Sequence, residues 1–333
     1  MTRKHHQLDE DDVRVRPGKG KSRPRSKDRP EHIDARTGMV VAVDRGRFTV
    51  ELADGVTMYA VKARELGRKG IVVGDRVDVV GDTSGVIDTQ GRIVRRGERE
   101  TTLRRTADDT DPVERVIVAN ATRLGIVVAA ADPPPRIGLI DRALVAAFDA
   151  GIDPLLIVTK TDLGSPGELE AMYRPLDVEM HLVERGHVGD GLRKTLRDEV
   201  TVLVGHSGVG KSTLVNGLVD DASARSTGRV NTVTGRGRHT STSVAALRLP
   251  HGGWVIDTPG IRSFGLAHID VARVFEAFPD LHGLTGECPR ACSHDEPDCA
   301  LNDVEDPGVR LRVESLRRLV RSRNDTPDDD HSD

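Results

Sequence analysis

One stretch decides the fold of this chain: Gly205-His206-Ser207-Gly208-Val209-Gly210-Lys211-Ser212. It matches G-x-x-x-x-G-K-[ST], a pattern whose glycines let backbone N–H groups curl around phosphates while the lysine reaches the β- and γ-phosphates. The apolar residues 202–204 predict a strand before it. Residues 212–219 predict a helix after it, with the positive end of the helix dipole at the phosphates. We therefore expect a nucleotide-phosphate site in which Lys211 is catalytic and Ser212 offers a hydroxyl to Mg²⁺.

A second motif lies downstream, where an apolar run predicts a strand that ends in Asp257-Thr258-Pro259-Gly260. This is the pattern D-x-x-G. We expect Asp257 to hold Mg²⁺ through water and the Gly260 N–H to sense the γ-phosphate. The phosphate loop alone does not choose between ATP and GTP, and this motif is the first of two that favour GTP.

The third motif, Thr159-Lys160-Thr161-Asp162, lies upstream and follows the apolar run 155–158. A carboxylate there can accept hydrogen bonds from guanine N1–H and the 2-amino group together, and adenine has neither donor. Asp162 is thus the predicted specificity residue, and the Lys160 stem can lie along the base. Thr159 stands where Asn is usual, and a hydroxyl has fewer donors than an amide. The second base-binding loop is expected at residues 183–186.

The predicted nucleotide-binding residues come from all three motifs and from one further threonine, described below. They are Thr159, Lys160, Thr161, Asp162, Gly205, His206, Ser207, Gly208, Val209, Gly210, Lys211, Ser212, Thr213, Thr240, Asp257 and Gly260.

Apolar strands alternate with helical patterns around these motifs, which is typical of a doubly wound parallel α/β sheet. The predicted strands are 123–129, 154–158, 178–183 and 201–204, and the predicted helices between them are 137–150, 165–173 and 190–198. In most GTP-binding domains the guanine motif comes last, whereas here it comes first. The same sheet is retained if the usual termini are joined and the chain is opened after D-x-x-G.

Residues 37–100 carry short alternating strands separated by turn residues, which predicts a small β-barrel of OB-fold size. The alternative is a generic β-sandwich fragment. The only aromatic residues in the segment 37–100 are Phe48 and Tyr59. Base stacking is therefore a poor fit, and contact with structured RNA through phosphate and shape suits it better.

All three cysteines lie in the pattern Cys288-x₃-Cys292-x-His294-x₄-Cys299. Three thiolates and an imidazole within twelve residues suit a closed, tetrahedral, structural Zn²⁺ site without a catalytic water. The alternative is three free thiols that cluster by chance. A helix predicted at 307–322 follows, with Val313 and Leu316 on its apolar face and arginines largely off it.

The chain resembles the circularly permuted GTPases, and most closely the ribosome small-subunit-dependent GTPase family. The resemblance covers residues 37 to 320 and includes the barrel, the motif order and the cysteine cluster. It also rests on Ile137–Ala150, Gly205–Thr213, Gly237–Thr242, Asp257–Gly260 and Ser263–Leu266. It implies an OB-fold that contacts ribosomal RNA near the functional centre of the subunit, a permuted GTPase domain and a small C-terminal zinc-binding domain. The implied role is late maturation of the small ribosomal subunit, which would stimulate GTP hydrolysis.

Three departures from the family's pattern matter. Thr159 replaces the usual Asn, and the paired threonines of switch I read Thr240-Ser241. This leaves open whether Thr240 or Thr242 meets the γ-phosphate and Mg²⁺. Where a gap between two ligands of the cysteine cluster is shorter than in the family, it is shorter by one residue. The loops between these ligands must therefore be tighter.

The residue after D-x-x-G, often a Gln that orients water, is Ile261. An aliphatic side chain cannot orient water by hydrogen bonding, so intrinsic turnover should be slow and gain strongly from a partner. His239 is a candidate catalytic group that positions this water. The alternative is that His239 only contacts a partner or solvent.

Composition bounds the remaining possibilities. Residues 13–30 hold eight Lys or Arg and one Asp, so we interpret residues 1–36 as a disordered basic arm, with a solubilising tail as the alternative. Residues 324–333 hold five Asp and predict a disordered acidic tail. No apolar run is long enough to span a bilayer. The three cysteines without an export signal favour a reducing cytoplasm, and we expect a monomer with no membrane partner.

The predicted domains are therefore a barrel at 37–100, a permuted GTPase at 101–275 and a zinc-binding domain at 276–323. Two other functions compete with a GTPase that acts on the ribosome. One is an ATPase or kinase, which tight ATP binding would support. The other is an RNA-binding adaptor with a vestigial nucleotide domain, and the intact Lys211, Ser212 and Asp257 argue against it.

Overall fold

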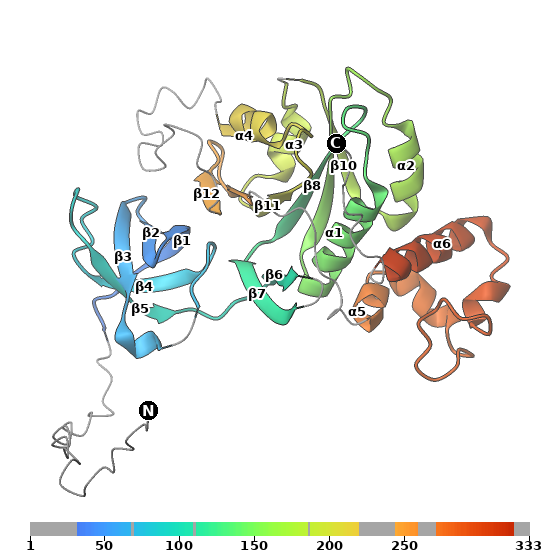
Figure 1. The fold of residues 1–333 in the computed structure, drawn as a ribbon, viewed down its shortest axis with the longest axis horizontal. Coiled ribbons are helices and arrows are strands. Elements are labelled where there is room, and N and C mark those ends of the chain that lie inside the picture. The colour runs from blue at the N-terminus through green and yellow to red at the C-terminus, as the bar shows by residue number, and fades with distance from the viewer. Residues whose placement is uncertain are drawn as a thin grey trace, which may run out of the picture. The chain divides into compact units, whose positions relative to one another are not determined.

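The computed structural model of the chain describes residues 32–67, 70–108, 111–185, 187–219, 244–258 and 271–322 (Figure 1). Several predicted features lie outside these ranges. They are residues 1–31 of the basic arm, the acidic tail, Gly186, and the switch residues His239, Thr240, Thr242, Gly260 and Ile261.

The first five strands close into a small barrel. They are β1 (Arg36–Asp44), β2 (Arg47–Leu52), β3 (Thr57–Lys62), β4 (Arg76–Gly81) and β5 (Gly91–Arg96). They pair in the order β1-β2-β3-β5-β4, and β4 returns to pair with β1. The interior is filled by alternate side chains of these strands, among them Val40, Phe48, Val50, Met58, Val79 and Ile93. Five strands closed in this order form an OB-fold barrel, so the predicted OB-fold is confirmed.

The nucleotide domain is built on a parallel sheet with the strand order β10-β9-β8-β11-β13. Its strands are β8 (Arg123–Ala129), β9 (Asp153–Thr159), β10 (Glu179–Val183), β11 (Val200–Val204) and β13 (Trp254–Asp257). Six of the seven residues of β8 are buried, as expected for a parallel strand covered on both faces. Strand β12 (Ala245–Arg248) runs antiparallel to β13 and joins barrel strand β1 through the pair Ala42 and Ala245.

Helices connect the parallel strands as predicted. They are α1 (Ile137–Ala150), α2 (Gly167–Tyr173), α3 (Asp190–Thr195) and α4 (Lys211–Val219), with a short 3₁₀ turn, η3 (Arg174–Leu176), after α2. Another 3₁₀ turn, η2 (Arg64–Leu66), lies in the barrel between β3 and β4. The bounds of α1 and β8 match the prediction, whereas α3 ends earlier than the predicted residue 198. Because each strand leads into a helix, the loops at the carboxyl ends of the strands gather at one edge of the sheet.

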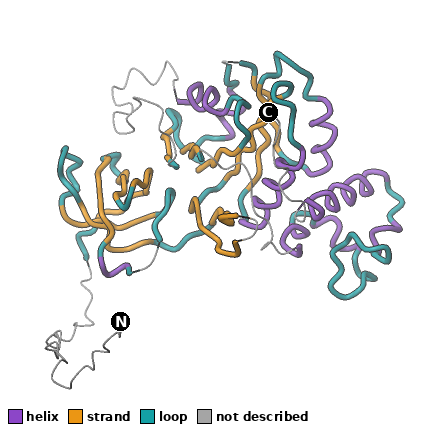
Figure 2. Tube along the Cα trace, viewed as in Figure 1, coloured by secondary structure: helices purple, strands orange, loops and turns teal. Residues whose placement is uncertain are grey.

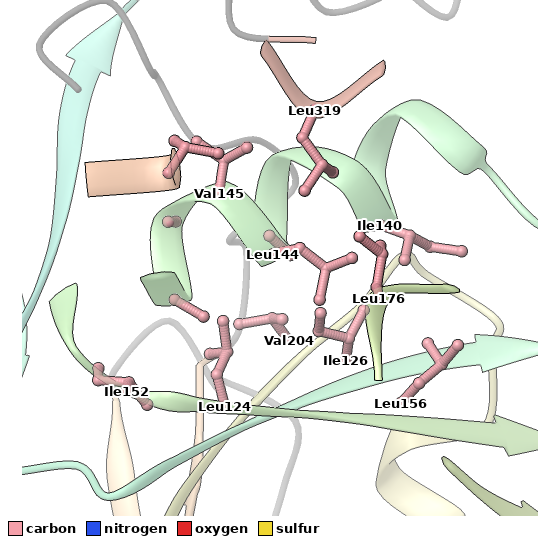
Figure 3. Close-up of a cluster of buried hydrophobic side chains, with 14 of the residues drawn as sticks. Leu124, Ile126, Ile140, Leu144, Val145, Ile152, Leu156, Leu176, Val204 and Leu319 are labelled. Carbon is pink, nitrogen blue, oxygen red and sulfur yellow. The ribbon is translucent and has the colours of Figure 1, made fainter. Parts of the chain in front are cut away.

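Helix α1 is the centre of the larger core. Every residue from Ile140 to Ala147 is buried. Figure 3 shows Ile140 and Leu144 directed toward the side chains of the sheet, while Leu319 approaches α1 from helix α6 (Pro307–Ser322). A helix buried on both sides cannot be strictly amphipathic, which accounts for the largely apolar sequence of α1.

The C-terminal region contains helices and loops but no strands among its described residues (Figure 2). Its elements are α5 (Val271–Glu276), η5 (Pro279–Leu284), η6 (Ala300–Asp303) and α6. Helix α6 buries Val313, Leu316, Leu319 and Val320, close to the predicted apolar face, in the same core as α1. None of the helices in the described ranges is both long and apolar enough to cross a membrane.

Four strands and α-helices were not predicted. β6 (Thr102–Asp108) and β7 (Asp111–Ala119) form a separate antiparallel hairpin before the parallel sheet. Its strands carry many charged residues, so their apolar alternation is weak. The other two are strand β12, which lies between β13 and β1, and helix α5, and both are too short to give a clear period.

Candidate functional site

The phosphate loop joins β11 to α4, and its glycines are needed for its shape. A Cβ atom on Gly205 would lie 2.4 Å from the carbonyl oxygen of Val127, so any larger residue would push the loop away from β8. Gly208 and Gly210 have φ angles of +83° and +91°, which residues with a side chain rarely adopt. The loop thus has the conformation that directs backbone N–H groups toward a bound anion.

Lys211 and the D-x-x-G carboxylate of Asp257 meet beside this loop. Strand β13 runs parallel to β11 with Asp257 opposite Leu203, and Asp257 Oδ1 lies 3.4 Å from Lys211 Nζ. That oxygen is buried and has no hydrogen-bond partner among the described residues. Thr258 anchors the end of β13 by donating to the Leu203 carbonyl at 2.8 Å. A lysine, a carboxylate and the exposed Ser212 are the groups that a Mg²⁺-bound phosphate requires.

Thr159 connects the guanine motif to the phosphate loop. Its side chain is buried, and Oγ1 lies 3.0 Å from the Val128 carbonyl and 2.5 Å from the Val209 carbonyl. A hydroxyl carries one hydrogen, so it can donate to only one of these carbonyls at a time. The threonine therefore ties the guanine motif to the phosphate loop with a single donor.

Lys160 extends the motif toward the phosphate loop. Its backbone is left-handed, with φ of +57°, and its Nζ donates to the Asp132 carbonyl. Pro133, which follows Asp132, lies against the phosphate loop. Its Cδ is 3.6 Å from the position that a Cβ atom on Gly208 would occupy. The Asp132–Pro133 segment was missed by sequence reasoning. The available signal was its position at the carboxyl end of a buried parallel strand, where ligand-binding loops gather.

The loop after β10, the predicted second base-binding loop, contacts the guanine motif. The backbone N–H of Arg185 donates to Asp162 Oδ1 at 3.2 Å, so this loop holds one oxygen of the Asp162 carboxylate. Asp162 itself is exposed, which leaves its other acceptor positions open for a ligand.

A cleft of about 380 Å³ joins these loops to the phosphate loop. Its walls come from the loops that follow β8, β9, β10 and β11. The lining residues are Asp132, Thr159, Lys160, Leu163, Val183, Glu184, Arg185, His187, Val188, Gly208, Gly210, Thr213 and Leu214. A volume of this size suits a small molecule, and its apolar and polar walls suit a purine base with a phosphate at one end.

The cysteine cluster forms a second site. The ligand atoms of Cys288, Cys292, His294 and Cys299 all lie within 4.8 Å of one another. Cys288 Sγ is 3.8 Å from both Cys299 Sγ and His294 Nδ1, and Cys299 Sγ is 3.9 Å from His294 Nδ1. Ligands at about 2.3 Å from the centre of a tetrahedron are about 3.8 Å apart. The predicted Cys₃His set therefore fits a small tetrahedral metal ion, and we call residues 288–299 the metal loop.

Neighbouring groups adjust the protonation of this set. Burial lowers the pKa of His294, which favours the neutral imidazole that a metal needs. Burial, assisted by Glu296 at 3.1 Å, raises the pKa of Cys292 to about 12. Metal binding must therefore release the proton of this thiol. Glu296 also accepts from the backbone N–H and the hydroxyl of Ser293, which fixes the turn between two ligands.

The arginines of α6 serve contacts within the protein. Arg317 donates to the His294 carbonyl at 2.8 Å, and Arg318 donates to Asp141 at 2.8 Å. Arg321 pairs with Asp295, and Arg310 donates to the Val304 carbonyl. Each of these four arginines therefore has a partner within the chain.

Comparisons with known proteins agree with this geometry. A family model described as RsgA GTPase matches residues 96–267. A protein of Chlorobaculum tepidum called small ribosomal subunit biogenesis GTPase RsgA is 38% identical over 304 residues, covering 86% of this chain and 97% of the relative. A protein of the same name from Pseudomonas syringae pv. tomato is 38% identical over 301 residues, covering 86% and 85%.

Solved structures show the same fold. The crystal structure of YjeQ from Thermotoga maritima is similar with a TM-score of 0.63 and 25% identity, over 88% of this chain and 100% of that one. The structure of YloQ, described as a circularly permuted GTPase, has a TM-score of 0.60 over 88% of this chain and 98% of that one. The reversed motif order predicted from the sequence is thus a circular permutation, and this chain belongs to the RsgA GTPase family and is a GTP hydrolase.

Proposed function

We propose that this GTPase acts in the late maturation of the small ribosomal subunit, and that the subunit stimulates its hydrolysis of GTP. Relatives that cover most of the chain carry the name small ribosomal subunit biogenesis GTPase. The observation that carries the proposal is the cleft in which residues of the guanine motif, the loop after β10 and the phosphate loop meet.

Guanine nucleotides are the proposed ligands of this cleft. Asp162 accepts from guanine N1–H and the 2-amino group, and the Lys160 stem lies along the base. Lys211 and the loop from Gly205 to Thr213 hold the phosphates, supported by the ion pair to Asp257. Ser212 and Asp257 hold Mg²⁺, which neutralises charge on the phosphates.

Three further residues complete the proposed hydrolytic machinery. Thr240 meets the γ-phosphate and Mg²⁺ from switch I, and Gly260 senses the γ-phosphate. His239 positions the attacking water, since Ile261 offers no hydrogen bond. A site that lacks a group on its own chain to orient water turns over slowly until a partner completes it. This accounts for dependence on the ribosomal subunit.

The metal of the second site is proposed to be one structural Zn²⁺. Three thiolates and one imidazole are a soft ligand set, and zinc prefers this set in tetrahedral sites. The spacing of the ligand atoms supports the choice. The role is structural because four protein ligands leave no position for a reacting water.

The barrel is the proposed contact with ribosomal RNA. Phe48 is buried, and the Arg47 guanidinium lies 5.5 Å from the centre of the Tyr59 ring. Phe48 is therefore not available to stack on a base, and Tyr59 already has an arginine over its ring. Arg45, Arg47 and Arg92 are exposed on the barrel, which supports contact with phosphates. We propose the domain limits given above, a monomer, and the cytoplasm as the place where subunits mature.

The test is GTP turnover by the purified protein, with and without purified small ribosomal subunits. We expect a large increase in turnover with subunits; activators that complete such a site reach about 10⁵-fold. Large subunits serve as the control and should not stimulate. If small subunits leave turnover unchanged, the ribosome-dependent function is wrong. A competing ATPase would reveal itself by binding ATP as tightly as GTP.

A further inference from the structure

A buried polar joint links the C-terminal helix to two helices of the nucleotide domain. Asp141 of α1 is 2% exposed and accepts hydrogen bonds from Tyr173 of α2 at 2.9 Å and from Arg318 of α6 at 2.8 Å. The Arg318 guanidinium also lies over the Tyr173 ring, 5.1 Å from its centre. A buried carboxylate needs such partners because burial penalises its charge. We call these three residues the α6 joint.

A second contact fastens the same helix beside the joint. Arg312 of α6 donates to the carbonyl oxygen of Pro175, two residues after α2 ends, and pairs with Asp280 at 2.6 Å. Its guanidinium lies 5.3 Å from the centre of the Phe278 ring. The end of α2 is thus held by two arginines of α6, one turn and a half apart.

The helices held in this way begin at the guanine end of the cleft. α1 follows the loop that carries Asp132, whose carbonyl accepts from Lys160, and Pro133, which lies against the phosphate loop. α2 follows the guanine motif directly. A shift of either helix would therefore move a wall of the base pocket, because both loops are short and cross-connected.

We propose that Arg318 is a positioning residue for guanine-nucleotide binding, which it serves by holding α1 and α2 together through Asp141 and Tyr173. The proposal rests on the proposed guanine specificity of the cleft. It makes base recognition depend on a helix of the C-terminal region that contributes no residue to the cleft. Phosphate binding, which relies on the loop after β11, should depend on it less.

The experiment compares Arg318→Met with wild type in equilibrium titrations of GDP and of inosine diphosphate, which lacks the 2-amino group read by Asp162. Methionine keeps much of the arginine stem but loses its charge and donors. We expect the Kd for GDP to rise about three- to thirtyfold, the range found for residues that couple distant sites. The Kd for inosine diphosphate should rise less, so the ratio of the two affinities falls.

Arg321→Met is the matched control, since Arg321 lies on the same helix but its pair with Asp295 is exposed and stays within the C-terminal region. It should leave both affinities unchanged. If Arg318→Met does not fold, Tyr173→Phe removes only the hydroxyl, and a rise of about two- to fivefold is then expected for GDP.

Two outcomes would overturn the proposal. One is a folded Arg318→Met or Tyr173→Phe variant with unchanged GDP affinity and an unchanged ratio of GDP to inosine diphosphate affinity. The other is an equal effect of Arg321→Met. If the wild-type protein binds GDP no better than ADP, the proposed guanine specificity is wrong. This result is distinct from the two outcomes that overturn the role of Arg318.

Discussion

The parallel sheet and the metal loop support the two sites of this protein in different ways. β8 and β11 are almost entirely buried and apolar, so hydrophobic burial fixes the strands whose ends carry the nucleotide loops. In the metal loop, Cys299 is the only buried residue, and the described residues there form no helix or strand. Its order must come from its ligand set and from polar contacts such as Arg317 to His294.

This difference teaches where each site is vulnerable. The nucleotide loops are short segments between rigid elements, so a side-chain change there alters binding more than folding. The metal loop has little core of its own, so loss of its ligand should alter folding locally. Helix α6 contacts both regions, through Arg317 on one side and Arg318 on the other.

Removal of the metal should have the largest effect and should separate the two regions. A structural Zn²⁺ contributes about 10–16 kcal/mol of apparent folding free energy in small domains. After treatment with a strong chelator, we expect the amides of residues 288–303 to lose protection in hydrogen exchange while those of β8 and β11 keep it. Added Zn²⁺ should restore protection. Equal loss in both regions would show that the sheet also depends on the metal, and the comparison would fail.

Lys211→Ala should have the next largest effect, on the nucleotide side alone. Removal of the ammonium group that stabilises transferring charge typically costs at least about 10²-fold in turnover. We expect single-turnover GTP hydrolysis with small subunits to fall by this factor while hydrogen exchange in the metal loop is unchanged. Lys194→Ala, on the exposed side of α3, is the control. Near-normal hydrolysis by Lys211→Ala would mean that Lys211 does not stabilise the charge on the transferring phosphate.

Much of the difference between the parallel sheet and the metal loop can be predicted from the sequence. The phosphate loop follows from glycines that only a tight turn requires, and the bounds of β8 and α1 follow from long, strongly apolar patterns. The Cys₃His set follows from ligand chemistry at short spacing, where the chain has no freedom to separate the residues far.

Contacts between distant residues are less visible. Asp141 lies in an apolar helix, and nothing local shows that its partners are 32 and 177 residues away. Asp132 acts through a backbone carbonyl, for which residue type gives no signal. The sequence shows the charge of the arginines of α6 but not the partners that they contact in the chain.

Asp162→Ala should have a smaller effect that is confined to the base. Loss of a charged acceptor for two guanine donors costs about 2–3 kcal/mol, or roughly a hundredfold in affinity. The expected result is that GDP binds nearly as weakly as ADP, while the melting temperature stays close to that of wild type. Glu168→Ala, an exposed acid of α2, controls for the loss of charge. A variant that still prefers GDP over ADP by the wild-type ratio would mean that another group reads the base.

Thr159→Val should have the smallest effect and tests how the two nucleotide loops are tied together. Valine keeps the shape of threonine but cannot donate to the Val128 or Val209 carbonyls. A neutral hydrogen bond contributes about 1 kcal/mol, so GDP affinity should fall about fivefold in equilibrium titration.

Thr159→Asn sharpens the same test in the opposite direction. An amide has two N–H donors and can bond both carbonyls at once where the hydroxyl must choose, so we expect GDP to bind more tightly than to wild type. Protection of the metal loop should be the same in both variants, because no contact of Thr159 reaches it. If the Thr159→Val and Thr159→Asn variants bind GDP equally, the Thr159 hydroxyl does not hold the two loops together. Burial of the strand ends alone then fixes the nucleotide loops.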